Sequence, residues 1–344
     1  MNVIAVKQDL AAGRTRISGE GASQRSARMM ISSAGRRVSL LRCFRESAQN
    51  LGIDLDIFAC DLQPEWSAAC ADADKFFTAP PAESDAFVPA MLEICEQESI
   101  GLIVPTIDTE LVAYAQAREQ FAAIGTSVAV SDLPLVTMAR DKLATARFLA
   151  QAGIASPRTA AAADFLVDQG GLSFPLLAKP RGGSSSRGIA VVENETQIRT
   201  LEAKEPYVLQ EILEGPEFTV SIYFDSEGQL KSAVPHERLR VRSGEVEKGT
   251  TVRHSLLEEM ARQLAQALHG ARGALCFQTR MTAAGLPSMF EINARFGGGY
   301  PLAHQAGATF TRWTLEEWLD LPSSATAEWR AGVRMLRYDD AIFL

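Results

Sequence analysis

The chain has 344 residues, of which 47% are hydrophobic and 22% charged, and its formal net charge is −8. This length allows two or three lobes with a sizeable core, and the composition is that of a soluble globular protein, which excludes disordered, collagen-like and membrane-spanning chains. The acidic balance argues against a dedicated nucleic-acid binder, because such proteins carry a basic face.

Cysteine usage and hydropathy both argue against export. The 5 cysteines are odd in number and contain no C-x-x-C pair, so neither a disulfide framework nor a zinc site is expected. No apolar run is long enough to span a membrane, and the first residues lack the continuous apolar region of a secretory signal. We therefore expect a cytoplasmic protein with no membrane partner.

The first part of the chain predicts an α/β domain. Residues 1–28 show no periodicity and are rich in small and polar residues, as in a flexible leader. After them, strand-like runs alternate with helical patterns; strands are expected at 55–61, 101–105 and 127–130, and helices at 38–44, 87–98 and 111–121. This alternation predicts a parallel sheet with helices on both faces, over residues 29–135.

The pattern changes near residue 135. A helix over 141–151 ends at Gly153, and from Tyr207 onward apolar and polar residues alternate with period two, as in antiparallel strands. Two faces are predicted there, the first with Phe218, Val220, Ile222 and Phe224, the second with Glu217, Thr219, Ser221 and Tyr223. The second part is therefore α+β, and we expect lobes at 136–206 and 207–344.

A Gly/Ser-rich loop follows a strand that ends in Lys179. Its small residues are Gly182, Gly183, Ser184, Ser185 and Gly188. Such a loop can fold its backbone N–H groups around phosphates while Lys179 supplies charge. It is not a Walker A loop, because the G-x-x-x-x-G-K-[ST] pattern and the following helix are absent. A surface hairpin remains the alternative interpretation.

Strand alternation also places Glu291, Asn293 and Arg295 on one face, with Phe290, Ile292 and Ala294 on the other. Mg²⁺ prefers hard oxygen ligands and usually takes one or two carboxylates plus substrate phosphates, which suits Glu291 and Asn293. Arg295 suits bidentate contact with a phosphate. Any half-exposed strand shows the same alternation, so this interpretation does not stand on one strand alone.

A third feature is the apolar strand over 207–211, which breaks at Gly215-Pro216 with carboxylates on both sides of the break. Backbone at such a kink can pair with a purine edge, and a carboxylate suits a ribose diol. A solvated turn explains the same residues equally well.

The order of these three segments resembles that of the ATP-grasp superfamily, and within it the single-unit proteins related to the ATP-binding half of carbamoyl-phosphate synthase and to biotin carboxylase. The resemblance covers roughly residues 30–340. It implies a Rossmann-like pre-ATP-grasp lobe followed by a two-lobed ATP-grasp domain. It also implies ATP and Mg²⁺, with Mn²⁺ as an alternative, a small-molecule carboxylate activated as an acyl phosphate, and an amine or thiol co-substrate. A homodimer is common in that family.

The resemblance assigns roles by position. Lys142 and Lys179 match the two phosphate-binding lysines, and the 182–188 loop matches the cover over the phosphates. The remaining assignments are Gln210, Glu211 and Ile212 for the adenine hinge, Glu217 for the ribose, Gln278, Glu291 and Asn293 for the metal, Arg295 for the transferred phosphoryl group, and Lys248 for a triphosphate contact. Many family members have an acidic residue where Gln278 stands, so the number of metal ions is left open.

The first lobe offers candidate substrate residues. Gly35 and Arg36 lie at the first strand-to-helix turn, where a helix N-terminus suits an anionic co-substrate. An NAD site with Asp61 on the ribose competes, although the G-x-G-x-x-G fingerprint is absent. Asp108 and Glu110 follow a strand end, where ligands tend to bind, and suit a substrate amine; helix capping by acidic residues is the alternative.

The function expected from these features is a Mg-ATP-dependent ligase that joins a carboxylate to an amine or a thiol. Two alternatives remain: a non-catalytic ATP-binding module, and one half of an enzyme like carbamoyl-phosphate synthase, which joins two such units. The four histidines form no catalytic spacing and receive no role.

Overall fold

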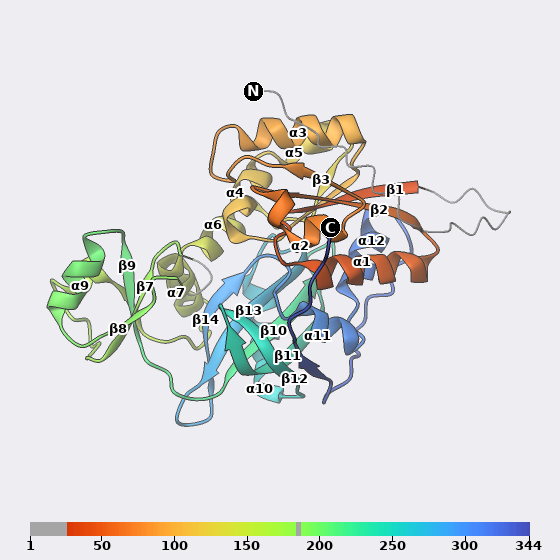
Figure 1. Cartoon of the computed structure of the whole chain (residues 1–344). Coiled ribbons are helices and arrows are strands. Elements are labelled where there is room, and N and C mark those ends of the chain that lie inside the picture. The colour runs from red at the N-terminus through yellow and green to blue at the C-terminus, as the bar shows by residue number, and fades with distance from the viewer. Residues whose placement is uncertain (1–25, 184–186) are drawn as a thin grey trace. The chain divides into compact units, whose positions relative to one another are not determined.

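The computed structural model describes residues 26–183 and 187–344, which form two compact units. The first unit holds residues up to Ala129 together with Asp340–Leu344, and the second holds Val130–Asp339 (Figure 1). The division therefore lies close to the boundary predicted near residue 135.

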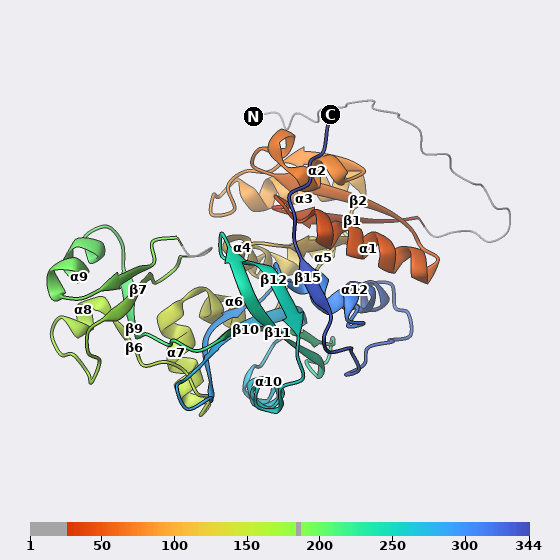
Figure 2. The same ribbon diagram turned by 60° about the horizontal axis from the view of Figure 1, so that its bottom comes forward.

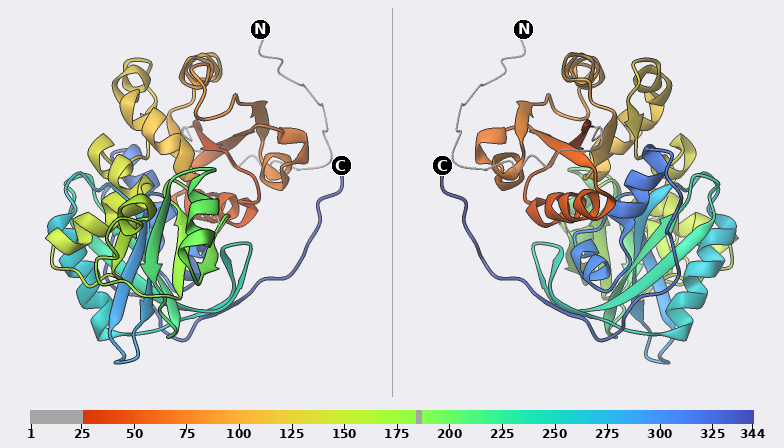
Figure 3. Two further views of the ribbon diagram at one scale, coloured as in Figure 1. Left: turned by 90° about the vertical axis from the view of Figure 1, so that its left-hand side faces the viewer. Right: turned by 90° about the vertical axis from the view of Figure 1, so that its right-hand side faces the viewer.

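The first unit is a five-stranded parallel sheet in the order β3-β2-β1-β4-β5. Its strands are β1 (Ser26–Ser32), β2 (Asp54–Asp61), β3 (Lys75–Thr78), β4 (Leu102–Pro105) and β5 (Ser127–Val128). Its helices are α1 (Val38–Leu51), the 3-10 helix η1 (Pro64–Trp66), α2 (Ala68–Asp72), α3 (Phe87–Glu98), α4 (Asp108–Gln116) and α5 (Arg118–Ala123). Helices α1 and α2 cover one face of the sheet and α3 and α5 the other (Figures 1 and 3). The predicted parallel sheet with two covered faces is confirmed.

Two expectations for this unit need correction. Strand β1 begins at Ser26, so residues 26–28 belong to the sheet and not to the leader, because they pair with β2. The single helix expected over 111–121 is interrupted at Ala117, where α4 ends and α5 begins. The break is invisible in the apolar pattern because Tyr114 and Phe121, one from each helix, both face the core.

The second unit begins with α6 (Leu133–Arg140) and α7 (Lys142–Gln151), which lead into a four-stranded antiparallel sheet in the order β6-β9-β7-β8. Its elements are β6 (Thr159–Ala161), α8 (Ala162–Phe165), β7 (Leu176–Pro180), β8 (Ala190–Val192), α9 (Glu195–Glu202) and β9 (Tyr207–Glu211). Helices α8 and α9 pack on this sheet over a small core that includes Phe165, Leu176 and Ile198 (Figure 2). The predicted lobe boundary at 206/207 is therefore wrong by one strand, because β9 pairs with β6 and β7.

The larger sheet has six antiparallel strands in the order β14-β13-β10-β11-β12-β15. Its strands and helices are β10 (Glu217–Phe224), β11 (Leu230–Arg242), β12 (Glu245–Thr251), α10 (Ser255–Ala267), β13 (Gly273–Met281), β14 (Pro287–Asn293), α11 (Tyr300–Gln305), α12 (Phe310–Trp318) and β15 (Arg334–Leu336). Helix α10 packs on one face, and α11 and α12 pack on the other (Figure 3).

Strand β10 is buried on both of its faces. The predicted alternation is confirmed, since every residue of β10 is paired in antiparallel register with β13. The apolar face lies toward α10, where Phe218 makes an edge contact with the His254 ring. The other face is buried as well, because Tyr223 packs against Phe310 and Trp313 of α12. Thr219 and Ser221 on this second face are therefore buried, which solvent-facing alternation would not predict.

The segment between the two sheets passes close to β13. A Cβ atom built on Gly215 would overlap the Met281 carbonyl group, whose carbon would lie 2.8 Å away. The Met281 N–H in turn donates to the Pro216 carbonyl, 3.0 Å away. Glycine at this position allows the connecting segment to lie directly on the larger sheet.

We expect Gly215→Ala to destabilise the second unit by about 2 kcal/mol, because backbone must move to admit the methyl group. For a unit of this size the melting temperature should fall by roughly 4–8 °C. Thermal unfolding measures the change. Gly182→Ala is the control, since a Cβ there meets no atom within 4 Å, and equal melting temperatures for the two variants would contradict the close approach.

Candidate nucleotide and metal site

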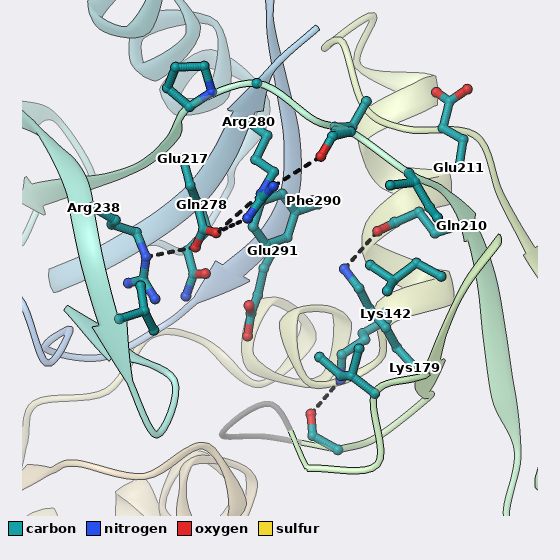
Figure 4. Close-up of a pocket in the computed structure, with 18 of the residues that line it drawn as sticks. Lys142, Lys179, Gln210, Glu211, Glu217, Arg238, Gln278, Arg280, Phe290 and Glu291 are labelled. Carbon is teal, nitrogen blue, oxygen red and sulfur yellow. Dashed lines mark hydrogen bonds and ion pairs between the residues drawn. The ribbon is translucent and has the colours of Figure 1, made fainter. Parts of the chain in front are cut away.

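A pocket of about 680 Å³ lies within the second unit, between the four-stranded and six-stranded sheets. Figure 4 shows its polar side chains converging from α7, β7, β9, β10, β11, β13 and β14. The labelled residues are Lys142, Lys179, Gln210, Glu211, Glu217, Arg238, Gln278, Arg280, Phe290 and Glu291. The sequence motifs that were predicted to bind a nucleotide and a metal therefore meet at one place.

Lys179 is the last residue but one of strand β7 and is only 7% exposed. Its Nζ donates to Gln210 Oε1 at 2.7 Å and lies 4.6 Å from the centre of the Phe290 ring. Burial lowers the pKa of Lys179 to about 8; Glu291 opposes this shift and Lys142 adds to it. The lysine is thus held in a place where an anionic ligand would stabilise its charged form.

Hydrogen bonds at the N-terminus of α7 fix the position of Lys142, the first residue of that helix. The Asp141 carboxylate caps the helix by accepting from the N–H groups of Leu143 at 2.9 Å and Ala144 at 3.2 Å. The same carboxylate accepts from the Arg181 guanidinium at 2.6 Å, and the Lys142 N–H donates to the Arg181 carbonyl at 3.1 Å. These bonds join the start of α7 to the segment after β7, so that Lys142 and Lys179 face the same pocket.

The glycine-rich loop is described only at its two ends. Lys142 Nζ donates to the Gly183 carbonyl and Arg140 donates to the Gly182 carbonyl, so the first end is bound to the start of α7. At the other end Gly188 has φ of +71° and its carbonyl accepts from the Tyr207 hydroxyl at 3.0 Å. Ser184 and Ser185, which were predicted to bind phosphate, lie outside the described residues.

The three predicted metal ligands, Gln278, Glu291 and Asn293, do not all line the pocket. Gln278 and Glu291 are cross-strand partners on β13 and β14, and both line the pocket. Asn293 and Arg295 lie beside them, with Arg295 donating to Asn293 Oδ1 at 2.9 Å, but neither lines the pocket, and Asn293 is buried. Its Nδ2 is enclosed without a hydrogen-bond partner.

This set of donors fits Mg²⁺ better than a softer metal. Within residues 26–183 and 187–344, no three or more His, Cys, Asp and Glu side chains gather as a metal cluster. A cation in the pocket would therefore depend on the Glu291 carboxylate and the Gln278 amide oxygen, with Asn293 beside them but outside the pocket lining. Mg²⁺ takes its remaining ligands from phosphates and water, so this small set of hard oxygens is sufficient for it.

Phe290 is a residue that strand alternation placed on the wrong face. It was predicted opposite Glu291, yet both residues line the pocket. The register shifts here: Gln278 pairs with Glu291 and Thr279 pairs with Met289, so Phe290 has no partner in the ladder. Such a β-bulge re-aims a side chain, and the pairing that produces it is not visible in one strand.

Glu217 lies in the pocket as a doubly paired carboxylate. One oxygen meets Arg238 Nε at 2.7 Å and the other accepts from Arg280 Nη2 at 2.9 Å. Arg280 also donates to the Leu213 carbonyl at 3.1 Å, which connects this pair to the segment between the sheets. Sequence reasoning gave Arg280 no role, although it is two residues beyond Gln278 on the same strand face.

The predicted adenine hinge consists of Gln210, Glu211 and Ile212, and not all of their side chains point into the pocket. Gln210 is buried and accepts from Lys179, while its Nε2 donates to Thr159 Oγ1 at 2.8 Å. The Glu211 carboxylate turns away from the pocket (Figure 4) and accepts from the Arg158 N–H at 3.0 Å. A base at this hinge would therefore meet the backbone of Glu211 and the side chain of Ile212, and not the Glu211 carboxylate.

Lys248 is not placed for the predicted triphosphate contact. Residues 238–250 form most of the β11–β12 hairpin and not an open loop. Lys248 is exposed on β12, pairs with Arg240 and Leu336 in the sheet, and lies outside the pocket. Successive strand side chains point to opposite faces, so a position near the pocket in sequence does not bring its side chain there.

The candidate residues of the first unit form a separate group. The Gly35 N–H donates to Asp61 Oδ2 at 2.8 Å, so the expected anion site at this turn already holds a carboxylate. Arg36 is exposed, and Asp108 is partly exposed in the first turn of α4. The predicted anionic ligand at the Gly35 N–H is therefore incompatible with this hydrogen bond.

Glu110 is a structural residue and not a substrate ligand. Its side chain is fully buried. It accepts from Ser32 Oγ at 2.6 Å, from Ser33 Oγ at 2.7 Å and from the Thr106 N–H at 2.7 Å. The capping alternative is correct, because the Ile107 N–H also donates to this carboxylate at 3.1 Å. The carboxylate thus joins the ends of β1 and β4.

Solved structures share this architecture. Biotin carboxylase from Campylobacter jejuni, in a complex named for β,γ-ATP, has a TM-score of 0.69 at 16% identity, over 88% of this chain and 73% of that one. The chain has the ATP-grasp fold. An N5-carboxyaminoimidazole ribonucleotide synthetase from Thermotoga maritima has a TM-score of 0.63 at 18% identity, over 88% of this chain and 78% of that one. An L-amino acid ligase from Bacillus licheniformis has a TM-score of 0.65 at 18% identity, over 90% of this chain and 78% of that one.

Two family models match separate parts of the chain. Residues 29–129 match the model described as "PylC-like, N-terminal domain". Residues 203–341 match the model described as "ATP-grasp in the biosynthetic pathway with Ter operon". A comparison with curated proteins returned no match. Among the described helices, none has the length and apolar character needed to cross a membrane.

We expect ATP affinity to fall as pH rises through about 8, where Lys179 loses its proton. Below that pH the ammonium is present and can pair with phosphate. A lysine with a lowered pKa is mostly neutral about one unit above it, so the ATP dissociation constant should rise by about tenfold at roughly pH 9. Titration of ATP binding between pH 6.5 and 9.5 checks this. Lys179→Arg should remove the pH dependence, because a guanidinium stays charged; a flat profile in the unaltered protein would contradict the assignment.

We expect Glu110→Ala to destabilise the first unit by about 3 kcal/mol or more, because it leaves the buried Thr106 N–H and the buried Ser32 hydroxyl without their carboxylate acceptor. Glu110→Gln should cost less, since its amide oxygen still accepts from the backbone. Burial raises the pKa of the Glu110 carboxyl, so charging it is unfavourable and the unaltered protein should lose stability relative to Glu110→Gln as pH rises. Thermal unfolding at acid and neutral pH tests both statements, and a parallel pH response of the two proteins would refute the second.

Proposed function

We propose that this protein is a Mg-ATP-dependent ligase that phosphorylates the carboxylate of a small molecule and then joins it to an amine or another nucleophile. The observation that carries the proposal is the convergence in one pocket of two lysines, Lys142 and Lys179, with the oxygen donors Gln278 and Glu291. The similarity to proteins named as ligases and synthetases supports the same reading.

The proposed reaction has two steps. A carboxylate oxygen of the substrate attacks the γ-phosphorus of ATP, the bond to the β,γ-bridging oxygen breaks, and ADP leaves, which produces an acyl phosphate. The nitrogen of an amine then attacks the acyl carbon, and the carbon–oxygen bond to the phosphate breaks. Inorganic phosphate leaves with the electron pair of that bond and takes up the proton that the nitrogen loses.

The protein's part is positioning and charge neutralisation. Lys142 and Lys179 would hold phosphate oxygens from the side of β7 and α7. Glu291 and Gln278 would hold Mg²⁺, which neutralises phosphate charge when bound, and the third predicted ligand, Asn293, lies beside them outside the pocket lining. Arg295, which donates to Asn293, would steady the transferred phosphoryl group only if its side chain turned into the pocket, which it does not line here. Glu217 would face the ribose while Arg238 and Arg280 fix its position.

We expect ADP release from Mg-ATP to require a particular pair of a carboxylate and a nucleophile. In that assay Lys179→Ala and Glu291→Ala should each lower turnover by about 100-fold or more, because each removes charge stabilisation that acts on the transferring phosphoryl group. A panel of amino acids and small carboxylates, tested singly and in pairs with amines, supplies the substrates.

The control is Lys204→Ala, because Lys204 is exposed and lies outside the pocket. Its turnover should equal that of the unaltered protein. If the protein binds ATP but no pair stimulates ADP release, the non-catalytic binding module becomes the better description. Near-normal turnover in Lys179→Ala would remove that lysine from the mechanism.

A further inference from the structure

The β11–β12 hairpin forms part of the pocket wall, and the pairing between its two strands is irregular. Its strands are joined by Ser243 and Gly244, both with positive φ, at +52° and +78°, as in the tight turns typical of two-residue hairpins. Arg238 pairs with Gly249 and Arg240 pairs with Lys248, so Leu239 has no partner. A β-bulge therefore re-aims the side chain of Leu239.

The hairpin arginines that line the pocket are occupied by carboxylates. Arg238 is paired with Glu217 at 2.7 Å and also donates to the Gly244 carbonyl at 2.9 Å. Arg240 is paired with Glu247 at 2.8 Å. The Arg238 charge is therefore balanced in a buried ion pair, whereas the Arg240 side chain stays 65% exposed beside its partner.

The apolar side chains between the arginines are exposed instead. Leu239 is 61% exposed and Val241 is 41% exposed, and both line the pocket. Single exposed apolar residues are ordinary on a protein surface. Two of them on one bulged strand, both in the wall of a pocket, present apolar surface that a bound ligand would remove from water.

The hairpin belongs to the end of the pocket away from the hinge. In Figure 4, Arg238 lies on the opposite side of the pocket from Gln210 and Glu211. The hairpin tip also meets the segment after Arg295: a Cβ built on Gly298 would lie 2.5 Å from the Glu245 carboxyl carbon. Arg337 joins the two, donating to Glu245 at 2.8 Å and to the Gly298 carbonyl.

We infer that Leu239 and Val241 form an acceptor subsite, and that one of the two co-substrates, the carboxylate or the nucleophile, carries an apolar body that packs on them. The inference rests on the proposed function, in which Lys142, Lys179 and Glu291 of the same pocket hold the phosphates and metal of Mg-ATP. The paired arginines and glutamates around the subsite favour an apolar body over one with a second charge.

The test uses matched small molecules and direct binding. The unaltered protein, saturated with Mg-ADP, is titrated calorimetrically with 4-methylpentanoate against succinate, and with 3-methylbutylamine against ethanolamine. The apolar member of at least one pair should bind about tenfold more tightly, as a small apolar group in a pocket typically provides. Leu239→Ser should remove most of that preference and leave Mg-ADP affinity unchanged.

Leu286→Ser is the matched control, because Leu286 is 55% exposed in the same unit but lies outside the pocket. It should keep the preference. The inference is overturned if neither apolar probe binds, if the preference is absent, or if it survives in both Leu239→Ser and Val241→Ser. It is also overturned if Leu239→Ser weakens Mg-ADP binding as much as probe binding, since the leucine would then serve the nucleotide.

Turnover separates this inference from the proposed function. Binding that prefers the apolar probe and depends on Leu239, without ADP release from any substrate pair, supports the subsite and refutes the ligase. ADP release that is equally efficient with apolar and charged acceptors supports the ligase and refutes the subsite.

Discussion

The second unit depends on one buried ammonium group. Removing a lysine side chain from water is unfavourable unless other groups replace its hydration. For Lys179 these groups are the Gln210 amide oxygen, the Phe290 ring and the charge of Glu291. Gln210 belongs to the four-stranded sheet, whereas Phe290 and Glu291 belong to the six-stranded sheet. Groups from both sheets thus compensate the charge of Lys179, and this lysine lies where the two sheets meet.

Most other charges in this region are compensated in pairs. Asp141 balances Arg181 at the start of α7, and Glu217 balances Arg238 on the larger sheet. These pairs let an acidic chain concentrate cationic groups at one pocket without leaving isolated charges in partly buried positions. The paired arginines therefore hold a strand or a carboxylate in place. Lys142 and Lys179 instead donate to neutral oxygen acceptors, which a phosphate can replace.

Bulges bring two apolar side chains to the pocket wall beside its charged groups. Phe290 on β14 and Leu239 on β11 each fall at a shift in the ladder, and each lines the pocket. In a regular strand either side chain would follow the period-two pattern of its neighbours. The shift lets one strand present a polar and an apolar residue in succession to the same pocket.

The sequence by itself determined the parallel first unit, the antiparallel alternation of β10, and most of the site. Lys142, Lys179, Glu217, Gln278 and Glu291 lie in one pocket because each is anchored in a strand or helix whose local pattern is strong. Non-local pairing decided the rest. It placed β9 in the smaller sheet, put Phe290 in the pocket, kept Lys248 out of it, and enclosed Glu110 between β1 and β4. A residue's own neighbours in sequence carry no information about which strand will lie beside it, and that pairing sets both register and burial.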